Sequence, residues 1–281
     1  MAGLGCETDE WLLVDHEKIE FVLQELSKNW PSSVQMYNFI QSCMLWSTHY
    51  PHAETKVFYE SRAGYGTIIA SFKAEAYIVT VYSAALPNLS IANALKAGKV
   101  VNLNDGSVLL SCIPKEISPT IAKAMRDHNV AGPNTFNEYW LSADLAKSVN
   151  FQCPEDMYLS NLEPEHAATV VLHWPYAGAN SLDVITQMIN VFDTVGIFTK
   201  KDSKLVSWVL NTYYGIGMLH TIEEYRRKGY GSVIVKKLVK SLGDKGIHSY
   251  ILTRPDNHAA NSLFMNIGFK QLNQVDFMRV S

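Results

Sequence analysis

Arg226-Arg227-Lys228-Gly229-Tyr230-Gly231 lies between an apolar run, Gly215–Thr221, and a helix-like run, Ser232–Leu242. This order predicts a strand, a glycine turn and a helix. The unpaired backbone N–H groups of a helix's first turn, together with the helix dipole, favour a bound anion. Gly229 and Gly231 lack the Cβ atoms that would keep a pyrophosphate away from those N–H groups. The stretch therefore predicts a phosphate-binding turn; a basic helix flank with two ordinary turn glycines is the alternative.

The residues on either side of this turn predict alternating strands and helices. Downstream, His248–Thr253 is typical of a half-buried strand, and the helix His258–Asn266 and the strand Val275–Val280 follow it. Upstream, residues 158–210 predict a strand, two helices and two strands. The expected fold class is α/β, in the sense of α+β elements around a mixed sheet.

Two motifs in this region resemble the GNAT superfamily of acyltransferases. The Arg-x-x-Gly-x-Gly spacing at 226–231 is similar to its coenzyme A pyrophosphate turn. Asn257–Phe269 resembles its pattern Asn-x-x-Ala-x-x-x-aromatic-x-x-x-Gly-Phe. The two motifs occur in the right order, separated by one helix and one strand. The resemblance implies a GNAT acyltransferase fold in the C-terminal half, with acyl-CoA, acetyl-CoA included, as co-substrate.

A closer resemblance is to the glycine N-acyltransferase family. Leu205–Trp208 and Thr221–Arg226 are similar to a Val-Ser-Trp strand that leads to a Thr-Leu-Pro-Glu-Tyr-Arg segment in that family. Trp30–Tyr37 resembles, more weakly, the family's Leu-Pro-x-Ser-x-x-x-Tyr. This resemblance implies two domains of related fold, the first a degenerate GNAT-like α/β domain and the second catalytic.

The N-terminal half is expected to be α/β and to extend to about residue 150. The loop-like stretches Ala131–Asn134 and Gln152–Pro154 suggest domains at 1–150 and 151–281. The elements predicted before them are a helix at His16–Asn29, strands at Lys56–Glu60, Thr67–Phe72, Ala76–Ser83 and Val108–Cys112, a turn at Asn104–Gly106 and a helix at Ser118–Asp127.

The resemblance also implies roles for individual residues. Glu224 matches the glutamate that acts as general base on the amine, which is an ammonium ion at neutral pH. His220 is a weaker rival base. The backbone of the strand end would pair with the pantetheine arm and stabilise the oxyanion, the turn would bind the pyrophosphate, and Asn257 would bond the pantetheine amides. The predicted coenzyme-binding residues are Leu219, His220, Thr221, Arg226, Arg227, Lys228, Gly229, Tyr230, Gly231, Ser232, Asn257 and Phe264.

Phe264 departs from the superfamily pattern. Many members carry a tyrosine at this position, and its hydroxyl protonates the leaving thiolate. A phenylalanine cannot do so, which leaves water, another group such as Ser262, or a low rate. Four aromatic residues are candidates for an acyl pocket, with core or loop packing as the alternative: Trp174, Tyr176, Tyr213 and Tyr214.

Composition narrows the range of partners. The net charge of −3 argues against nucleic acid or an anionic membrane as the main partner. No apolar run is long enough to span a bilayer. The acidic N-terminus shows no recognisable targeting peptide, so we expect an intracellular protein, cytoplasmic or mitochondrial. The four cysteines are widely spaced, which predicts reduced thiols: Cys6, Cys43, Cys112 and Cys153. No metal is expected, because Cys43, His49 and His52 match no established zinc spacing.

Four functions remain open at this point. The leading one is an acyl-CoA-dependent N-acyltransferase that acts on glycine or a similar small amine. The second is a peptide or protein N-acetyltransferase, for which an acidic groove is expected. The third, motivated by Phe264, is a protein that binds acyl-CoA without turnover. The fourth is an unrelated α/β module with a coincidental turn, which would not bind the coenzyme.

Overall fold

The computed structural model describes residues 11–102 and 106–281, and within them the chain forms two compact units. Unit 1 contains the described parts of Met1–Ile40 and Tyr50–Thr135 together with Gln274–Ser281. Unit 2 contains Gln41–His49 and Phe136–Asn273. Each unit therefore includes a segment that is distant in sequence from the rest of it.

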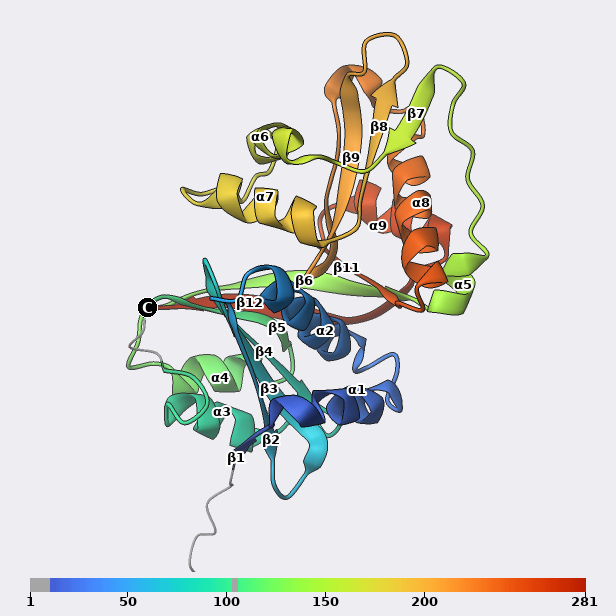
Figure 1. The fold of residues 1–281 in the computed structure, drawn as a ribbon. Coiled ribbons are helices and arrows are strands. Elements are labelled where there is room, and N and C mark those ends of the chain that lie inside the picture. Colours follow the sequence, from blue (N-terminus) through green and yellow to red (C-terminus); the bar gives the residue numbers. More distant parts are fainter. Residues whose placement is uncertain (1–10, 103–105) are drawn as a thin grey trace, which may run out of the picture. The chain divides into compact units, whose positions relative to one another are not determined.

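The first half of the chain carries helices and strands in the order β-α-α-β-β-β-α-β-α-β (Figure 1). Their bounds are β1 Trp11–Leu13, η1 (a 3-10 helix) His16–Lys18, α1 Ile19–Ser27, α2 Val34–His49, β2 Glu54–Glu60, β3 Gly64–Lys73, β4 Tyr77–Ser83, α3 Leu89–Lys96, β5 Val108–Pro114, α4 Ser118–Ala124 and β6 Val130–Leu141.

The second half repeats this order after the short helix α5, Ala143–Lys147. Its elements are β7 Met157–Ser160, η2 Pro164–His166, α6 Ala167–Leu172, α7 Ser181–Val191, β8 Thr194–Thr199, β9 Leu205–Thr212, β10 Gly215–Thr221, η3 Glu223–Tyr225, α8 Tyr230–Asp244, β11 Ser249–Thr253, α9 His258–Ile267 and β12 Lys270–Val280.

Strand pairing is also the same in the two units. In unit 1, β1 to β4 are successive antiparallel neighbours, β4 and β5 are parallel, and β5 pairs antiparallel with β12. In unit 2, β7 to β10 are antiparallel neighbours, β10 and β11 are parallel, and β11 pairs antiparallel with β6. Both halves thus build the same mixed α/β arrangement, as expected of a duplication. Each unit takes its sixth strand from the other half of the sequence.

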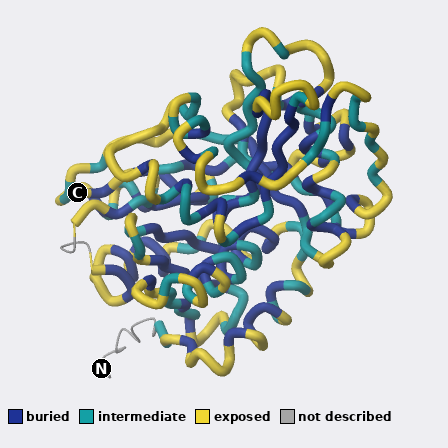
Figure 2. Tube along the Cα trace, turned by 45° about the horizontal axis from the view of Figure 1, so that its top comes forward, coloured by how far each residue is buried: buried dark blue, intermediate teal, exposed yellow. Residues whose placement is uncertain are grey.

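Helix α8 shows how unit 2 acquires its core. Its apolar residues recur at helical spacing, and the side chains of Ile234, Val235, Leu238, Val239 and Leu242 are buried against the sheet. Burial of each such side chain stabilises the fold by about 1.5–3 kcal/mol. Strand β9 is buried along nearly its whole length, because α6 and α7 lie on one side of β8 and β9 and α8 and α9 lie on the other (Figure 1). Figure 2 shows the buried residues of the chain in dark blue.

Two expectations about the first half need correction, and helix α2 was missed. Ala131–Asn134 is part of strand β6 rather than a loop, because its backbone runs close to the end of β12: a Cβ on Gly132 would lie 2.8 Å from the carbonyl oxygen of Phe277. Helix α2 was not predicted, because its apolar residues are spread around the helix, Leu45 on the exposed side among them, and leave no clear apolar face. The helix expected at Ser118–Asp127 ends at Ala124.

Other expectations about this half stay open. The division at residue 150 stays a prediction; the compact units divide the chain at 135/136 and again at 273/274. Cys6 and most of the turn predicted at Asn104–Gly106 lie outside the described residues.

Candidate active site

Strands β10 and β11 of unit 2 begin side by side and then separate. They pair in parallel at Ile216 and Ile251. Strand β10 then bulges between Gly217 and His220, where Met218 has a φ of 53°. Beyond the bulge β10 stays paired with β9, His220 opposite Trp208. The divergence leaves a split between two parallel strands.

A cavity of about 490 Å³ occupies this split. Its walls come from both faces of the sheet, since α6 and α9 lie on opposite sides of the strands (Figure 1). The lining residues are Phe136, Val170, His173, Trp174, Pro175, Tyr176, Trp208, Ile216, Gly217, Met218, Leu219, His220, Ile251, Leu252, Thr253, Arg254, Asn257, Ala260 and Phe264. A mostly apolar cavity with a few polar groups is typical of a small-molecule site.

Two histidines and a tryptophan form one cluster in the cavity wall. The rings of His220 and Trp208 are stacked with centroids 5.0 Å apart, and the ring of His173, just after α6, lies 4.6 Å from that of His220. Burial, then the nearby His173 and Arg226, lower the pKa of His220 from 6.5 to about 4, against a small opposing effect of Glu223. His220 is therefore neutral at pH 7, with a ring nitrogen able to accept a proton.

The predicted turn has the backbone of an anion-binding loop. Arg227 and Gly229 are both left-handed, with φ of 61° and 81°. Helix α8 starts directly after Gly229, and no side chain caps it. Backbone N–H groups in such a left-handed turn and in the first turn of a long helix together form a positively polarised concavity.

Gly231 is unconstrained by its own surroundings. Its φ is not positive, and a Cβ added there would be 3.8 Å from Thr221 Oγ1 and no closer to any other group. Neither backbone strain nor packing therefore demands a glycine. The open space in front of the α8 start fits an anionic group that comes close to the backbone, such as the pyrophosphate of coenzyme A.

The three basic residues of the turn are exposed, and local contacts hold Arg226 and Lys228. Arg226 Nε donates to the carbonyl oxygen of Thr221 (3.1 Å), and its guanidinium pairs with Glu223. Lys228 Nζ lies 5.0 Å from the ring centroid of Tyr225. These cations add positive charge beside the concavity.

Glu224 lies on the surface in η3. Its side chain is 75% exposed, and its Oε2 is 3.9 Å from Lys204 Nζ. It is not among the residues that line the cavity. The structure thus places the predicted base next to the glycine turn but outside the cavity wall.

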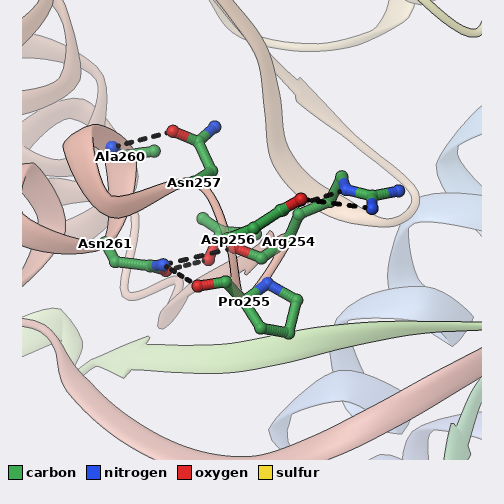
Figure 3. Close-up of polar contacts among 7 residues, drawn as sticks. Arg254, Pro255, Asp256, Asn257, Ala260 and Asn261 are labelled. Atoms are coloured by element: carbon green, nitrogen blue, oxygen red, sulfur yellow. Dashed lines mark hydrogen bonds and ion pairs between the residues drawn. The ribbon is translucent and has the colours of Figure 1, made fainter.

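The segment after β11 is fixed by two asparagines (Figure 3). Asn257 caps α9, its Oδ1 accepting from the N–H of Ala260 (3.2 Å). Asn261 is buried and donates to the carbonyl oxygens of Arg254 and Pro255, both at 3.2 Å. Its Oδ1 accepts from Thr253 and from Tyr139 (3.0 Å). These bonds hold the end of β11 at the cavity.

Arg254 carries the only permanent charge among the described cavity-lining residues. Its Nε and Nη2 donate to the carboxylate of Asp256 at 3.1 and 3.4 Å (Figure 3). The hydrogen bond with Asp256, and then one with Tyr176, raise the pKa of the guanidinium. The described lining residues include no carboxylate.

The structure brings some of the predicted residues together in the cavity and leaves others beside it. Leu219, His220, Asn257 and Phe264 line it, and the turn 226–232 lies just beyond Thr221. Trp174 and Tyr176 also line it, but Tyr213 and Tyr214 do not. Phe264 is buried between Tyr139 and Phe269, so its ring also belongs to the core.

Four residues of the site were missed: His173, Trp208, Arg254 and Asn261. Asn261 carried a usable signal, since a polar residue on the apolar side of a predicted helix needs a buried partner. Within residues 11–102 and 106–281, no three His, Cys, Asp or Glu side chains are placed to hold a metal ion. The helices of that same part of the chain are all too short or too polar to cross a membrane.

Comparisons with known proteins agree with this architecture. The family model described as FR47-like protein matches residues 194–278. A Drosophila protein of known structure superposes with a TM-score of 0.84 at 15% identity, over 97% of this chain and 99% of that one. No curated protein matches the sequence.

Two further solved structures carry the GNAT name. A tandem GNAT protein from the clavulanic acid biosynthesis pathway gives a TM-score of 0.55 at 15% identity, over 96% of this chain and 97% of that one. A GCN5-related N-acetyltransferase from Sphaerobacter thermophilus gives 0.52 at 11% identity, over 80% of each. At these identities the likeness concerns the fold: the chain has a mixed α/β fold whose structural neighbours are GNAT proteins, tandem ones included.

Proposed function

We propose that this protein is an acyl-CoA-dependent N-acyltransferase that transfers an acyl group to the amine of glycine or a similar small amine. The observation that carries the proposal is the cavity in the β10–β11 split, with the glycine turn and the uncapped start of α8 directly after β10. An extended chain in the split can hydrogen-bond to the β10 backbone while its anionic end reaches the turn.

The two faces of the cavity suit two substrates. The coenzyme would lie towards α9, near Asn257 and the turn at Gly229–Ser232. The amine would enter from the α6 face, past His173 and Trp174. A backbone N–H at the β10 bulge would stabilise the oxyanion as the amine attacks the thioester carbonyl.

The charge of the cavity favours a small amino acid over a basic peptide. A peptide lysine or a polyamine calls for nearby carboxylates, and the described lining has none. Arg254 instead offers a cation to the carboxylate of an amino acid, which would share the guanidinium with Asp256 and Tyr176. This supports glycine or a similar amino acid as acceptor, in keeping with the resemblance of Thr221–Arg226 to glycine N-acyltransferases.

The test is release of free thiol from acetyl-, longer aliphatic and aromatic acyl-CoAs mixed with glycine, amines without a carboxylate and a lysine peptide. Amine-dependent release that is fastest with an amino acid is the expected result. Calorimetry with coenzyme A is run in parallel. Binding without release from any pair would establish the acyl-CoA-binding alternative, and absence of binding would refute both.

A further inference from the structure

We propose that His220 is the group that takes the proton from the attacking amine, with His173 as the residue that positions its ring. This assignment rests on the proposed function. It starts from the His173–His220–Trp208 cluster in the cavity wall.

His220 lies where a proton acceptor for the amine is needed. His220 follows the β10 bulge, where the strand has left β11 and the split is open. Its ring stacks on Trp208 at 5.0 Å and contacts His173 at 4.6 Å, and the rings of His173 and Trp208 also lie 5.5 Å apart. These ring contacts restrict the rotamers of His220 before substrate binds, which favours a catalytic group.

His173 is the other histidine of the described lining, but it follows α6, whereas His220 lies on the strand that borders the split. The described lining contains no carboxylate, and Glu224 is 75% exposed beside Lys204. His220 is neutral at pH 7 because burial, His173 and Arg226 lower its pKa to about 4, and Glu223 opposes this only weakly. A neutral imidazole can accept a proton, whereas an imidazolium cannot.

After water has taken the first proton of the ammonium, His220 alone can accept the second proton and return it to the leaving group. The ammonium form of the acceptor loses one proton to water, and the nitrogen lone pair then forms the C–N bond to the thioester carbonyl carbon. The nitrogen becomes acidic as that bond forms, and His220 takes its second proton. The C–S bond breaks with its electron pair on sulfur, and His220 returns the proton to it, giving an amide and a free thiol.

Return of the proton by His220 supplies the proton donor that Phe264 cannot be. Protonated His220, with a pKa of about 4, is a far stronger acid than a thiol with a pKa of about 8.5. Transfer from His220 to the thiolate is therefore downhill. A tyrosine hydroxyl on α9 is not needed as the proton donor.

The experiment compares His220→Gln, His220→Ala, His173→Gln and Glu224→Gln in the full chain. Thiol release, calorimetric binding of coenzyme A and melting temperature are measured for each. Loss of a general base lowers kcat by about 10²–10⁴-fold. We expect such a loss in both His220 variants with coenzyme binding unchanged, a smaller loss in His173→Gln, and little change in Glu224→Gln.

Two further readouts separate chemistry from structure. Added imidazole should restore turnover to His220→Ala, and NMR titration of the wild type should find one histidine, absent in His220→Gln, with a pKa well below 6.5. Loss of activity in Glu224→Gln with retention in the His220 variants would overturn the assignment and leave the acyltransferase intact. A wild type that releases no thiol from any pair would refute the proposed function itself.

Discussion

The imidazole rings of His173 and His220 lie 4.6 Å apart, one just after the end of α6 and the other on β10. Burial, and then the nearby His173, oppose protonation of His220. Protonation of this site is therefore coupled to stability.

The first prediction concerns pH. Because the pKa of His220 is about 4 in the folded protein and 6.5 in an ordinary environment, the unfolded chain binds more protons between these values. The free energy of unfolding should thus fall as pH drops from about 6.5 to about 4. Urea midpoints across this range should fall less steeply for His220→Gln than for the wild type. Parallel curves would show that His220 does not titrate as stated.

The second prediction concerns the glycine turn. Gly231→Ala adds a methyl group that meets no atom closer than 3.8 Å, so the melting temperature should hardly change. The same methyl group would stand where a pyrophosphate must approach the backbone, and coenzyme A should bind at least about tenfold more weakly. Gly178→Ala is the matched control, because its Cβ also enters open space. Equal coenzyme affinity in the two variants would contradict the phosphate site.

The third prediction concerns Arg254. Arg254→Met removes a charged hydrogen-bond donor for the acceptor's carboxylate, so kcat/KM for glycine should fall by roughly tenfold or more. Amines without a carboxylate should be affected far less, and coenzyme A binding should not change. A uniform loss for all amines would mean that Arg254 serves the loop rather than the substrate.

The fourth prediction concerns the closed end of the split. Gly215 has a φ of 91°, and a Cβ there would lie 2.4 Å from the carbonyl oxygen of Tyr250 on β11. Gly215→Ala should therefore lower the free energy of unfolding by about 2 kcal/mol or more. Gly217→Ala, with no atom within 4 Å of its Cβ, is the control for stability. Equal urea midpoints would show that β10 and β11 can separate freely at this point.

Local signals explain what the sequence could predict. The glycine turn, α8, β11 and α9 are each encoded by residues within a few positions of one another, such as Gly229 at the α8 start and Gly268, left-handed, at the α9 end. The order of elements in the C-terminal half followed from these signals, and the mixed α/β fold class was confirmed.

Long-range contacts explain what was missed. Nothing near Trp208 or His173 in sequence indicates that both rings meet His220, because β9, β10 and the end of α6 come together only in the fold. Likewise, Gly132 and Pro133 weaken a strand prediction by local propensity, yet the approach of the β12 backbone places them in β6.

The exchange of sixth strands constrains the order in which the protein can be completed as it is made. Unit 2 needs β6 and residues up to 273, all of which leave the ribosome before the residues of β12 that pair with β5. Unit 1 must hold an open sheet edge beside β5 until residues 275–280 emerge. Unit 1 is thus the first unit whose synthesis begins and the last whose sheet is completed.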